Sequence, residues 1–432
     1  MDRILMIVID GLGDQAQEDL GRRTPLQVAY TPNLNHLALL GGCGLYHGLG
    51  SGVILPSDLA HFLLLGYPVN QFPGRGYLEA LGAGLDTPPN TAFFVAQGCW
   101  IDERGVLLDS HPGVEPEEWE EILQAIPRSM HHQGQRLTLH SIAPGEALVE
   151  VEGGSHEVSD THPLVPGSPS LKAEPFDKGN RKAVATAELL NRYLVEVHRV
   201  LQALPSNRMS RRENVPVVNA VLTWGGGMFR SLESLEERWG LKSASLAAGR
   251  AYKGLSLALG MAHEELPELD DPGDDLLKRL QRAERLLEEY DLIYLHVLAV
   301  HRAAHTRNPW NKVEAIESLD RALPYLAERF VTQDGLLTVI TGDHSIPSSG
   351  FMLHSGEPVP LLIIGNKVRR GETRTFDEVT VAQGSLGFLR GAELMHTILS
   401  YTGRGNMFGR YQGPQHRPYF SPHLATPMPW EF

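Results

Sequence analysis

The sequence predicts an α/β fold, in which helices flank a mainly parallel sheet and an α+β domain is inserted into that core. Three observations lead to this prediction. Aliphatic runs that end in polar turns stand near both ends of the chain. The middle of the chain has shorter, alternating segments. The length of 432 residues also exceeds what one hydrophobic core usually supports.

The first expected strand covers residues 4–9 and is aliphatic throughout, as parallel strands buried on both faces are. It ends at Asp10-Gly11, and sites in open α/β sheets form at this end of the strands. Thr31-Pro32 then predicts the start of a helix, because leucines follow it on a helical period. A strand–turn–helix unit results.

The second half of the chain continues this scheme. Residues 274–287 carry leucines on one helical face, and residues 292–295 follow as an aliphatic strand. Two further buried strands are expected, at residues 335–342 and 359–365. Because the strands then come from both ends of the chain, we assign the core to residues 1–90 and 226–410.

Residues 91–225 are expected to form the inserted domain. Residues 147–152 alternate between apolar and charged side chains, and one long amphipathic helix runs from near Ala183 to Leu204. We interpret this domain as a cap, because caps close over sites. Residues 411–432 are rich in proline and aromatic residues without periodicity. We expect this tail to pack on the chain or on another copy, which leaves a homo-oligomer open.

Composition excludes several classes of partner. A formal net charge of −14 argues against nucleic acid and anionic membranes, which need a basic surface. No apolar stretch approaches the ~20 residues of a membrane span, and the amino terminus lacks a signal cleavage site, so we expect a soluble cytoplasmic protein. Two cysteines, Cys43 and Cys99, cannot form a disulfide framework. An acidic protein that handles phosphate needs local cations, and nineteen histidines offer nitrogen ligands for metal ions.

Histidines and carboxylates follow the later strands. Asp343 and His344 come where an aliphatic strand gives way to a loop, and His354 lies ten residues further on. Zinc and manganese accept this mixed oxygen and nitrogen ligation. His301 and His305 are spaced i and i+4, on one face of a helical turn, and can grip one ion. These residues are metal-ligand candidates.

Ser57 precedes an apolar helix in the segment Leu55-Pro56-Ser57-Asp58-Leu59-Ala60-His61. The positive end of a helix favours an anion, either a phosphoryl group or a serine alkoxide. The alternative is a simple serine N-cap.

Taken in order, these motifs resemble the archaeal-type, cofactor-independent phosphoglycerate mutases of the alkaline phosphatase superfamily. The similarity runs from Met1 to about Gly409 and implies an alkaline phosphatase-like core. It rests on Asp10-Gly11, Ser57-Asp58-Leu59-Ala60-His61, Gly74-Arg75-Gly76-Tyr77-Leu78-Glu79-Ala80-Leu81-Gly82, the pair His301 and His305, Thr341-Gly342-Asp343-His344, and His354-Ser355-Gly356-Glu357-Pro358-Val359-Pro360.

The resemblance implies a site for two divalent metal ions, with manganese or zinc ranked first and magnesium a further candidate. One ion is expected on Asp10, Ser57, Asp343 and His344, and the other on His301, His305 and His354. Ser57 would attack phosphorus and form a phosphoserine. A mutase would return the phosphoryl group to another hydroxyl and so interconvert 2- and 3-phosphoglycerate, whereas a phosphatase would give it to water.

Four further residues are candidates. Arg75 is expected either to contact the phosphoryl group or to form a structural salt bridge. His61, one turn after Ser57, is either a proton donor or a histidine packed between domains. Asp160 and His162 of the inserted domain are expected to contact substrate when the cap closes.

The chain departs from the family pattern at several positions. His301 stands where the pattern has an aspartate, and Leu298 where it has a lysine. The arginines expected near Phe94 and at Trp224 are missing. Since bidentate arginine contacts fix phosphates strongly, we expect a rebuilt substrate pocket that includes Phe94, Trp224 and Leu298.

Three functions therefore stay open. The first is a phosphomutase acting on a small phosphorylated metabolite, with phosphoglycerate mutase as the default. The second is a phosphatase or phosphonate-type hydrolase with a less charged substrate. The third is a metal-binding paralogue without catalytic activity.

Overall fold

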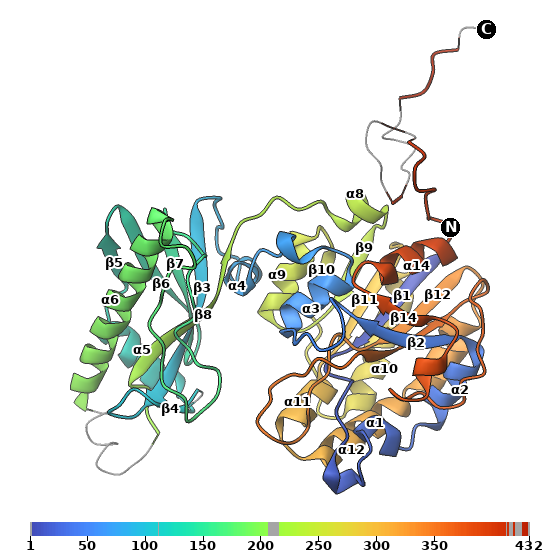
Figure 1. The fold of residues 1–432 in the computed structure, drawn as a ribbon, viewed down its shortest axis with the longest axis horizontal. Helices are drawn as coiled ribbons and strands as arrows, with labels where there is room; N and C mark the ends of the chain where they lie inside the picture. Colours follow the sequence, from blue (N-terminus) through green and yellow to red (C-terminus); the bar gives the residue numbers. More distant parts are fainter. Residues whose placement is uncertain are drawn as a thin grey trace. The chain divides into compact units, whose positions relative to one another are not determined.

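The computed structural model describes residues 2–110, 112–205, 216–411, 413, 418–419 and 426–430. The chain divides into two compact units (Figure 1), a core unit of Met1–Phe72 with Leu232–Phe432 and an inserted unit of Pro73–Ser231. The inserted unit is longer at both ends than the expected 91–225, because residues 73–90, which include Arg75, and residues 226–231 belong to it. Much of the expected tail lies outside the described residues, so its packing stays a prediction.

An eight-stranded sheet organises the core unit. Its order is β10-β9-β11-β1-β12-β13-β2-β14, and every neighbouring pair is parallel except the two pairs that β13 makes. The mainly parallel sheet predicted from the sequence is thus confirmed. The strands are β10 (Ala262–Glu264), β9 (Ser243–Leu246), β11 (Leu292–Val297), β1 (Arg3–Ile9), β12 (Leu336–Thr341), β13 (Val359–Ile364), β2 (Gly42–His47) and β14 (Gly387–Arg390).

The register of the sheet decides where its loops meet. β1 lies between β11 and β12, pairing Ile4 with Leu292 and with Leu337. Because the three strands are parallel, their carboxyl ends reach the same edge of the sheet, which we call the carboxyl edge. β13 runs the opposite way and therefore begins at this edge. The loops that follow β1, β11 and β12 and the loop that precedes β13 consequently come together.

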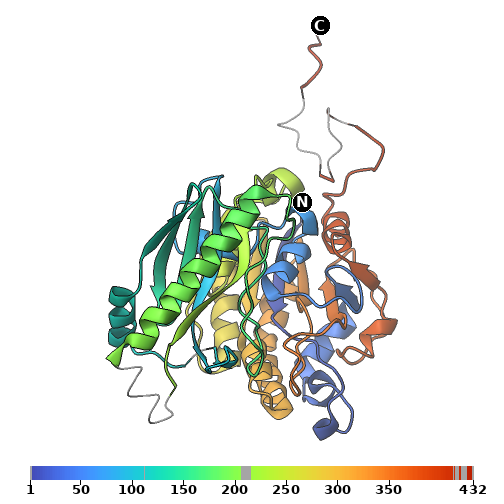
Figure 2. The same cartoon turned by 60° about the vertical axis from the view of Figure 1, so that its left-hand side comes forward.

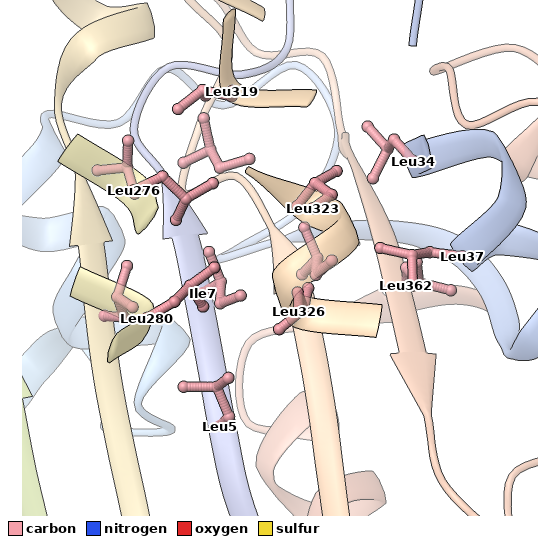
Figure 3. Packing of buried hydrophobic residues seen from close by; sticks show 14 of the residues in the cluster. Leu5, Ile7, Leu34, Leu37, Leu276, Leu280, Leu319, Leu323, Leu326 and Leu362 are labelled. Atoms are coloured by element: carbon pink, nitrogen blue, oxygen red, sulfur yellow. The ribbon is translucent and has the colours of Figure 1, made fainter. Parts of the chain in front are cut away.

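Leucines from four helices cover one face of this sheet (Figure 3). In Figure 3, Leu5 and Ile7 of β1 lie among them. The helices are α2 (Pro32–Leu40), α10 (Pro272–Leu286), α12 (Pro309–Asp320) and α13 (Leu323–Leu326). The leucines whose helical period predicted α2 and α10 from the sequence form this buried stripe. Each fully buried leucine stabilises the fold by about 1.5–3 kcal/mol.

The inserted unit is an antiparallel sheet with two longer helices. Figure 2 shows α6 (Arg181–Ala203), the helix predicted from near Ala183 to Leu204, lying along this sheet. Phe94 belongs to the hydrophobic core of the unit, so the expectation that it lines a pocket is wrong. The other elements are α4 (Arg75–Gly82), β3 (Thr91–Ile101), β4 (Leu107–Asp109), α5 (Pro116–Ala125), β5 (Ser129–His132), β6 (Gln135–Ala143), β7 (Glu146–Glu152) and β8 (Ala220–Met228).

The remaining helices of the core unit are short. None of the helices in the described part of the chain is long and apolar enough to cross a membrane. Both cysteines are buried free thiols. The short helices of the core unit are α1 (Pro25–Val28), α3 (Ser57–Leu64), α8 (Leu235–Trp239), α9 (Arg250–Ala258), α11 (Ala299–His305) and α14 (Glu393–Tyr401).

A buried lysine ties two loops of the carboxyl edge together. Lys312 of α12 is fully buried, and its Nζ donates to the carbonyls of Gly13 at 2.8 Å and Ile346 at 2.9 Å. It also donates to Asp14 Oδ2 at 3.0 Å. Gly13 and Asp14 follow β1, and Ile346 follows β12. One buried cation thus donates to three acceptors, and it supplies the positive charge that pairs with the buried Asp14 carboxylate.

We expect Lys312→Met to lower the free energy of unfolding by about 3–5 kcal/mol, because it leaves the Asp14 carboxylate buried without its cation. The double variant Lys312→Met with Asp14→Asn should cost less, since no uncompensated charge remains. Urea unfolding of the metal-free protein measures both. Lys367→Met serves as the matched control, because Lys367 makes an exposed pair with Asp2 that contributes little. Equal destabilisation by Lys312→Met and Lys367→Met would contradict this account.

Candidate active site

Asp10 stands at the end of β1 and is fully buried. Its carboxylate accepts from His301 Nδ1 at 2.8 Å, from His296 Nε2 at 3.0 Å and from the Tyr252 hydroxyl at 3.0 Å. Burial alone would raise the pKa of Asp10, but the positive charge at His301 and the three imidazole contacts hold this pKa well below its ordinary value. Asp10 is therefore an ionised group at the centre of the carboxyl edge.

Asp343 brings a second buried carboxylate to the same place. Its Oδ1 accepts from the backbone N–H of Gly11 at 2.9 Å, which joins the loop after β12 to the turn after β1. Its Oδ2 is in contact with Nδ1 of His344. Burial and the Asp10 charge raise the pKa of Asp343, but His344 and His61 outweigh them, so the pKa lies below its ordinary value. The two carboxylates are stabilised by the imidazoles around them.

Four imidazole rings gather beside these carboxylates. The ring centroids of His301 and His305, both on α11, are 4.5 Å apart. The His354 ring lies 6.4 Å from each of them and 4.1 Å from the His344 ring. Burial is the main cause that lowers the pKa of His354 to about 4, so its ring is neutral at physiological pH. Neutral imidazoles are the form that binds metal ions.

Ser57 is the first residue of α3 and is nearly buried, at 8% exposure. The N-cap of α3 is Pro56, so the alternative of a simple serine N-cap is wrong. Within the described part of the chain, the Ser57 hydroxyl has no hydrogen-bond partner. Its loop is tied to the His354 loop, because His354 Nδ1 donates to the Leu55 carbonyl at 2.7 Å. A second hydrogen bond joins the same two loops, because the backbone N–H of Gly52 donates to the carbonyl of Gly356 at 2.7 Å.

A second buried cluster surrounds His61. His61 Nε2 lies 3.3 Å from Asp343 Oδ2 and 3.6 Å from Asp10 Oδ2, and Nδ1 is in contact with the Tyr294 hydroxyl. Its ring centroid is 4.6 Å from that of His296 and 4.8 Å from that of Tyr252. His296, Tyr252 and Tyr294 were not predicted from the sequence. A polar residue near the end of the aliphatic strand β11 was the signal that could have found His296.

Three predicted substrate contacts lie in the inserted unit and make local contacts there. Arg75 forms an ion pair with Glu79 at 2.7 Å, and its guanidinium lies 5.7 Å from the centre of the Trp224 ring. Asp160 accepts from the backbone N–H of Gly225 at 2.8 Å. His162 Nδ1 accepts from the backbone N–H of Leu164 at 2.9 Å. A role of Arg75, Asp160 and His162 toward substrate stays a prediction.

The donor atoms of the core unit fit divalent metal ions. Two sets of donor atoms lie within 4.8 Å of one another, Asp10 with His301 and His344, and Asp10 with His61 and His296. His344 Nε2 is moreover buried with no hydrogen-bond partner among the described residues, as is expected of an atom that binds a metal ion. The first set combines His301 and His344, which the sequence analysis had assigned to different ions. The two predicted ligand sets therefore share neighbouring donor atoms in the structure.

His61 is expected to be protonated in the metal-free protein. Burial lowers its pKa, but Asp343 and Asp10 outweigh burial and raise it to about 9, against ~6.5 in the unfolded chain. The stability that this charge contributes is fully present below pH 6.5 and is lost as the pH rises to about 9.

The test compares urea unfolding of chelator-treated wild type and His61→Gln at pH 6 and pH 9.5. The variant should lose more stability at the lower pH than at the higher. His36→Gln, at an exposed position of α2, is the control and should keep the wild-type pH dependence. A stability loss in His61→Gln that is equal at both pH values would show that His61 is neutral.

Comparison with known proteins confirms the resemblance seen in the motifs. The model of the Metalloenzyme superfamily matches residues 2–401. The 2,3-bisphosphoglycerate-independent phosphoglycerate mutase 2 of Methanocaldococcus jannaschii is 36% identical, over 96% of this chain and 97% of its own. The corresponding mutase of Pyrobaculum neutrophilum is 34% identical, over 95% and 100%.

Two solved structures are similar to this chain. A protein from Pyrococcus horikoshii matches with a TM-score of 0.73 and 28% identity, covering 95% of this chain and 99% of its own. The cofactor-independent phosphoglycerate mutase from Thermoplasma acidophilum matches with a TM-score of 0.59 and 29% identity, covering 93% and 100%. Together with the motifs and the geometry of the carboxyl edge, these matches show that the chain belongs to the 2,3-bisphosphoglycerate-independent phosphoglycerate mutase family of the Metalloenzyme superfamily.

Proposed function

We propose that the protein is a metal-dependent phosphoryl-transfer enzyme that interconverts 2- and 3-phosphoglycerate through a phosphoserine at Ser57. The observation that carries this proposal is the gathering of two ionised carboxylates and four imidazoles at the carboxyl edge, with the Ser57 loop bound to the His354 loop. The names of the mutases of Methanocaldococcus jannaschii and Pyrobaculum neutrophilum support the choice of substrate.

Two divalent cations are the cofactors that these residues would hold. We assign Asp10, Ser57, Asp343 and His344 to one cation and His301, His305 and His354 to the other, with manganese or zinc first and magnesium as a further candidate. When bound, such ions lower the pKa of a coordinated hydroxyl and act as Lewis acids toward the phosphoryl oxygens.

The protein residues divide the remaining work. Ser57 Oγ attacks phosphorus, the bond between phosphorus and the glycerate oxygen breaks, and that oxygen takes up the proton that Ser57 has lost. The N–H groups at the start of α3 favour the negative charge on Ser57. His61 has its Nδ1 in contact with Tyr294 and its Nε2 beside both carboxylates, so it acts as a positioning residue that holds Asp10 and Asp343. The other hydroxyl of the glycerate then attacks phosphorus, the bond between phosphorus and Ser57 Oγ breaks, and the proton of that hydroxyl returns to Ser57 Oγ.

A hydrolase is the second candidate, and Leu298 favours it. Leu298 lies between β11 and α11, three residues before His301, so an apolar side chain stands at the carboxyl edge where the family pattern has a cation. Loss of a cation weakens a substrate that carries several negative charges more than one that carries few. A phosphate or phosphonate ester with a less charged remainder would suit this edge better.

The assay that tests the proposal follows 2-phosphoglycerate and free phosphate in protein loaded with manganese or zinc and given 3-phosphoglycerate. We expect 2-phosphoglycerate to form and Ser57→Ala to reduce the rate roughly 10³-fold or more, because the nucleophile is lost. Ser400→Ala, an exposed change on α14, is the matched control. Mass spectrometry of the trapped protein should find the phosphoryl group on Ser57.

Other results would select other functions. Release of phosphate without 2-phosphoglycerate, still dependent on Ser57, would indicate the hydrolase. Absence of phosphoserine with every substrate in a metal-loaded protein would indicate the paralogue without catalytic activity.

A further inference from the structure

Arg307 has a backbone conformation that arginine rarely adopts. It lies in the left-handed region, with a φ of 59°, just after α11 ends at His305. Its N–H donates to the Ala304 carbonyl at 3.1 Å and so completes the end of the helix. Glycine, or less often asparagine, usually occupies this position, because a larger side chain crowds the backbone there. An outlier of this kind points to a role for the side chain.

The Arg307 side chain holds the His354 loop, which joins β12 to β13. Its Nη1 donates to the Met352 carbonyl at 2.8 Å and to the Pro347 carbonyl at 3.0 Å. Because both carbonyls belong to the same loop, one nitrogen closes that loop. Among the described residues, Arg307 forms no ion pair with a carboxylate, so the two carbonyls are the partners that its guanidinium serves.

Other contacts leave this part of the loop weakly held. Lys312 fixes the start of the loop through the Ile346 carbonyl. Further along, the Phe351 side chain is 86% exposed and that of Met352 is 42% exposed, so hydrophobic burial contributes little there. The two hydrogen bonds from Arg307 are therefore the contacts that close the exposed part of the loop.

The closed loop leads directly to the nucleophile. His354 follows Met352 in the chain, and its Nδ1 donates to the Leu55 carbonyl at 2.7 Å. Leu55 belongs to the loop that carries Ser57. The contacts thus run from Arg307 through the His354 loop to the Ser57 loop.

We propose that Arg307 is a positioning residue of the phosphoryl-transfer site. Its guanidinium keeps the His354 loop closed, and the closed loop holds the His354 ring against the Leu55 carbonyl and so keeps Ser57 in place for attack. This inference rests on the proposed function, because phosphoryl transfer is the step that needs Ser57 in place. The left-handed backbone places the guanidinium where it reaches both loop carbonyls.

The first test measures the loop without substrate. Arg307→Gly and Arg307→Ala both remove the guanidinium, but only glycine relieves the left-handed strain. Chymotrypsin cleavage after Phe351, followed by mass spectrometry, reports how often the loop opens. We expect cleavage to be about tenfold faster or more in both variants, because two hydrogen bonds are lost. Cleavage at the wild-type rate in both would overturn the proposal.

The second test measures phosphoryl transfer in manganese-loaded protein given 3-phosphoglycerate. Both variants should lower kcat about tenfold or more and leave KM nearly unchanged, because a positioning residue acts on the nucleophile and makes no contact with substrate. A rise in KM with unchanged kcat would overturn the proposal in favour of a direct substrate contact. A loss of kcat confined to Arg307→Ala would overturn it in favour of a backbone effect.

Arg22→Gly is the matched control. Arg22 is also an arginine in the left-handed region, with a φ of 60°, and lies at an exposed position before α1. Its replacement should leave both kcat and cleavage after Phe351 unchanged.

The two tests separate this inference from the proposed function. Faster cleavage after Phe351 in a protein that transfers no phosphoryl group to Ser57 would support the hold of Arg307 on the loop and remove the phosphoryl transfer. Phosphoryl transfer through Ser57, with cleavage and kcat both unchanged in the Arg307 variants, would remove this inference alone.

Discussion

The Asp10 carboxylate, buried at the end of β1, is the interaction on which the site depends. It accepts from α11 through His301, from β11 through His296 and from α9 through Tyr252. An ionised carboxylate taken out of water costs several kcal/mol unless it is paired and hydrogen-bonded. The donors that offset this cost come from three separate elements, so the charge can be kept only when all of them are folded in place.

The sheet supplies the geometry that makes this pairing available. β1, β11 and β12 are parallel neighbours, and their carboxyl ends bring Asp10, His301 and Asp343 to one edge although the three lie far apart in the sequence. The N–H of Gly11 bonded to Asp343 and the Nζ of Lys312 bonded to Asp14 then fix the loops after β1 and β12 against each other. Metal ligands need such preorganisation, because small displacements of a ligand atom cost affinity.

Hydrogen bonds to Nδ1 are what give this site its chemical character. Through these bonds Asp10, Asp343 and the Leu55 carbonyl orient the imidazole rings of three histidines. The Leu55 carbonyl also connects the Ser57 loop to the His354 loop, since Leu55 lies two residues before Ser57. The position of the His354 ring and that of Ser57 are therefore physically coupled through one carbonyl.

The sequence by itself determined the mainly parallel sheet and the residues of its carboxyl edge, because aliphatic strands, the i and i+4 spacing of His301 and His305, and Asp343-His344 after β12 are local patterns. It could not assign His296, Tyr252 and Tyr294, whose importance comes from packing between β11, α3 and α9. Tertiary structure also decided that Phe94 is a core residue of the inserted unit and that the His344 and His354 rings lie 4.1 Å apart. Both depend on contacts between distant segments, and side-chain environments of that kind leave no periodic trace in the chain.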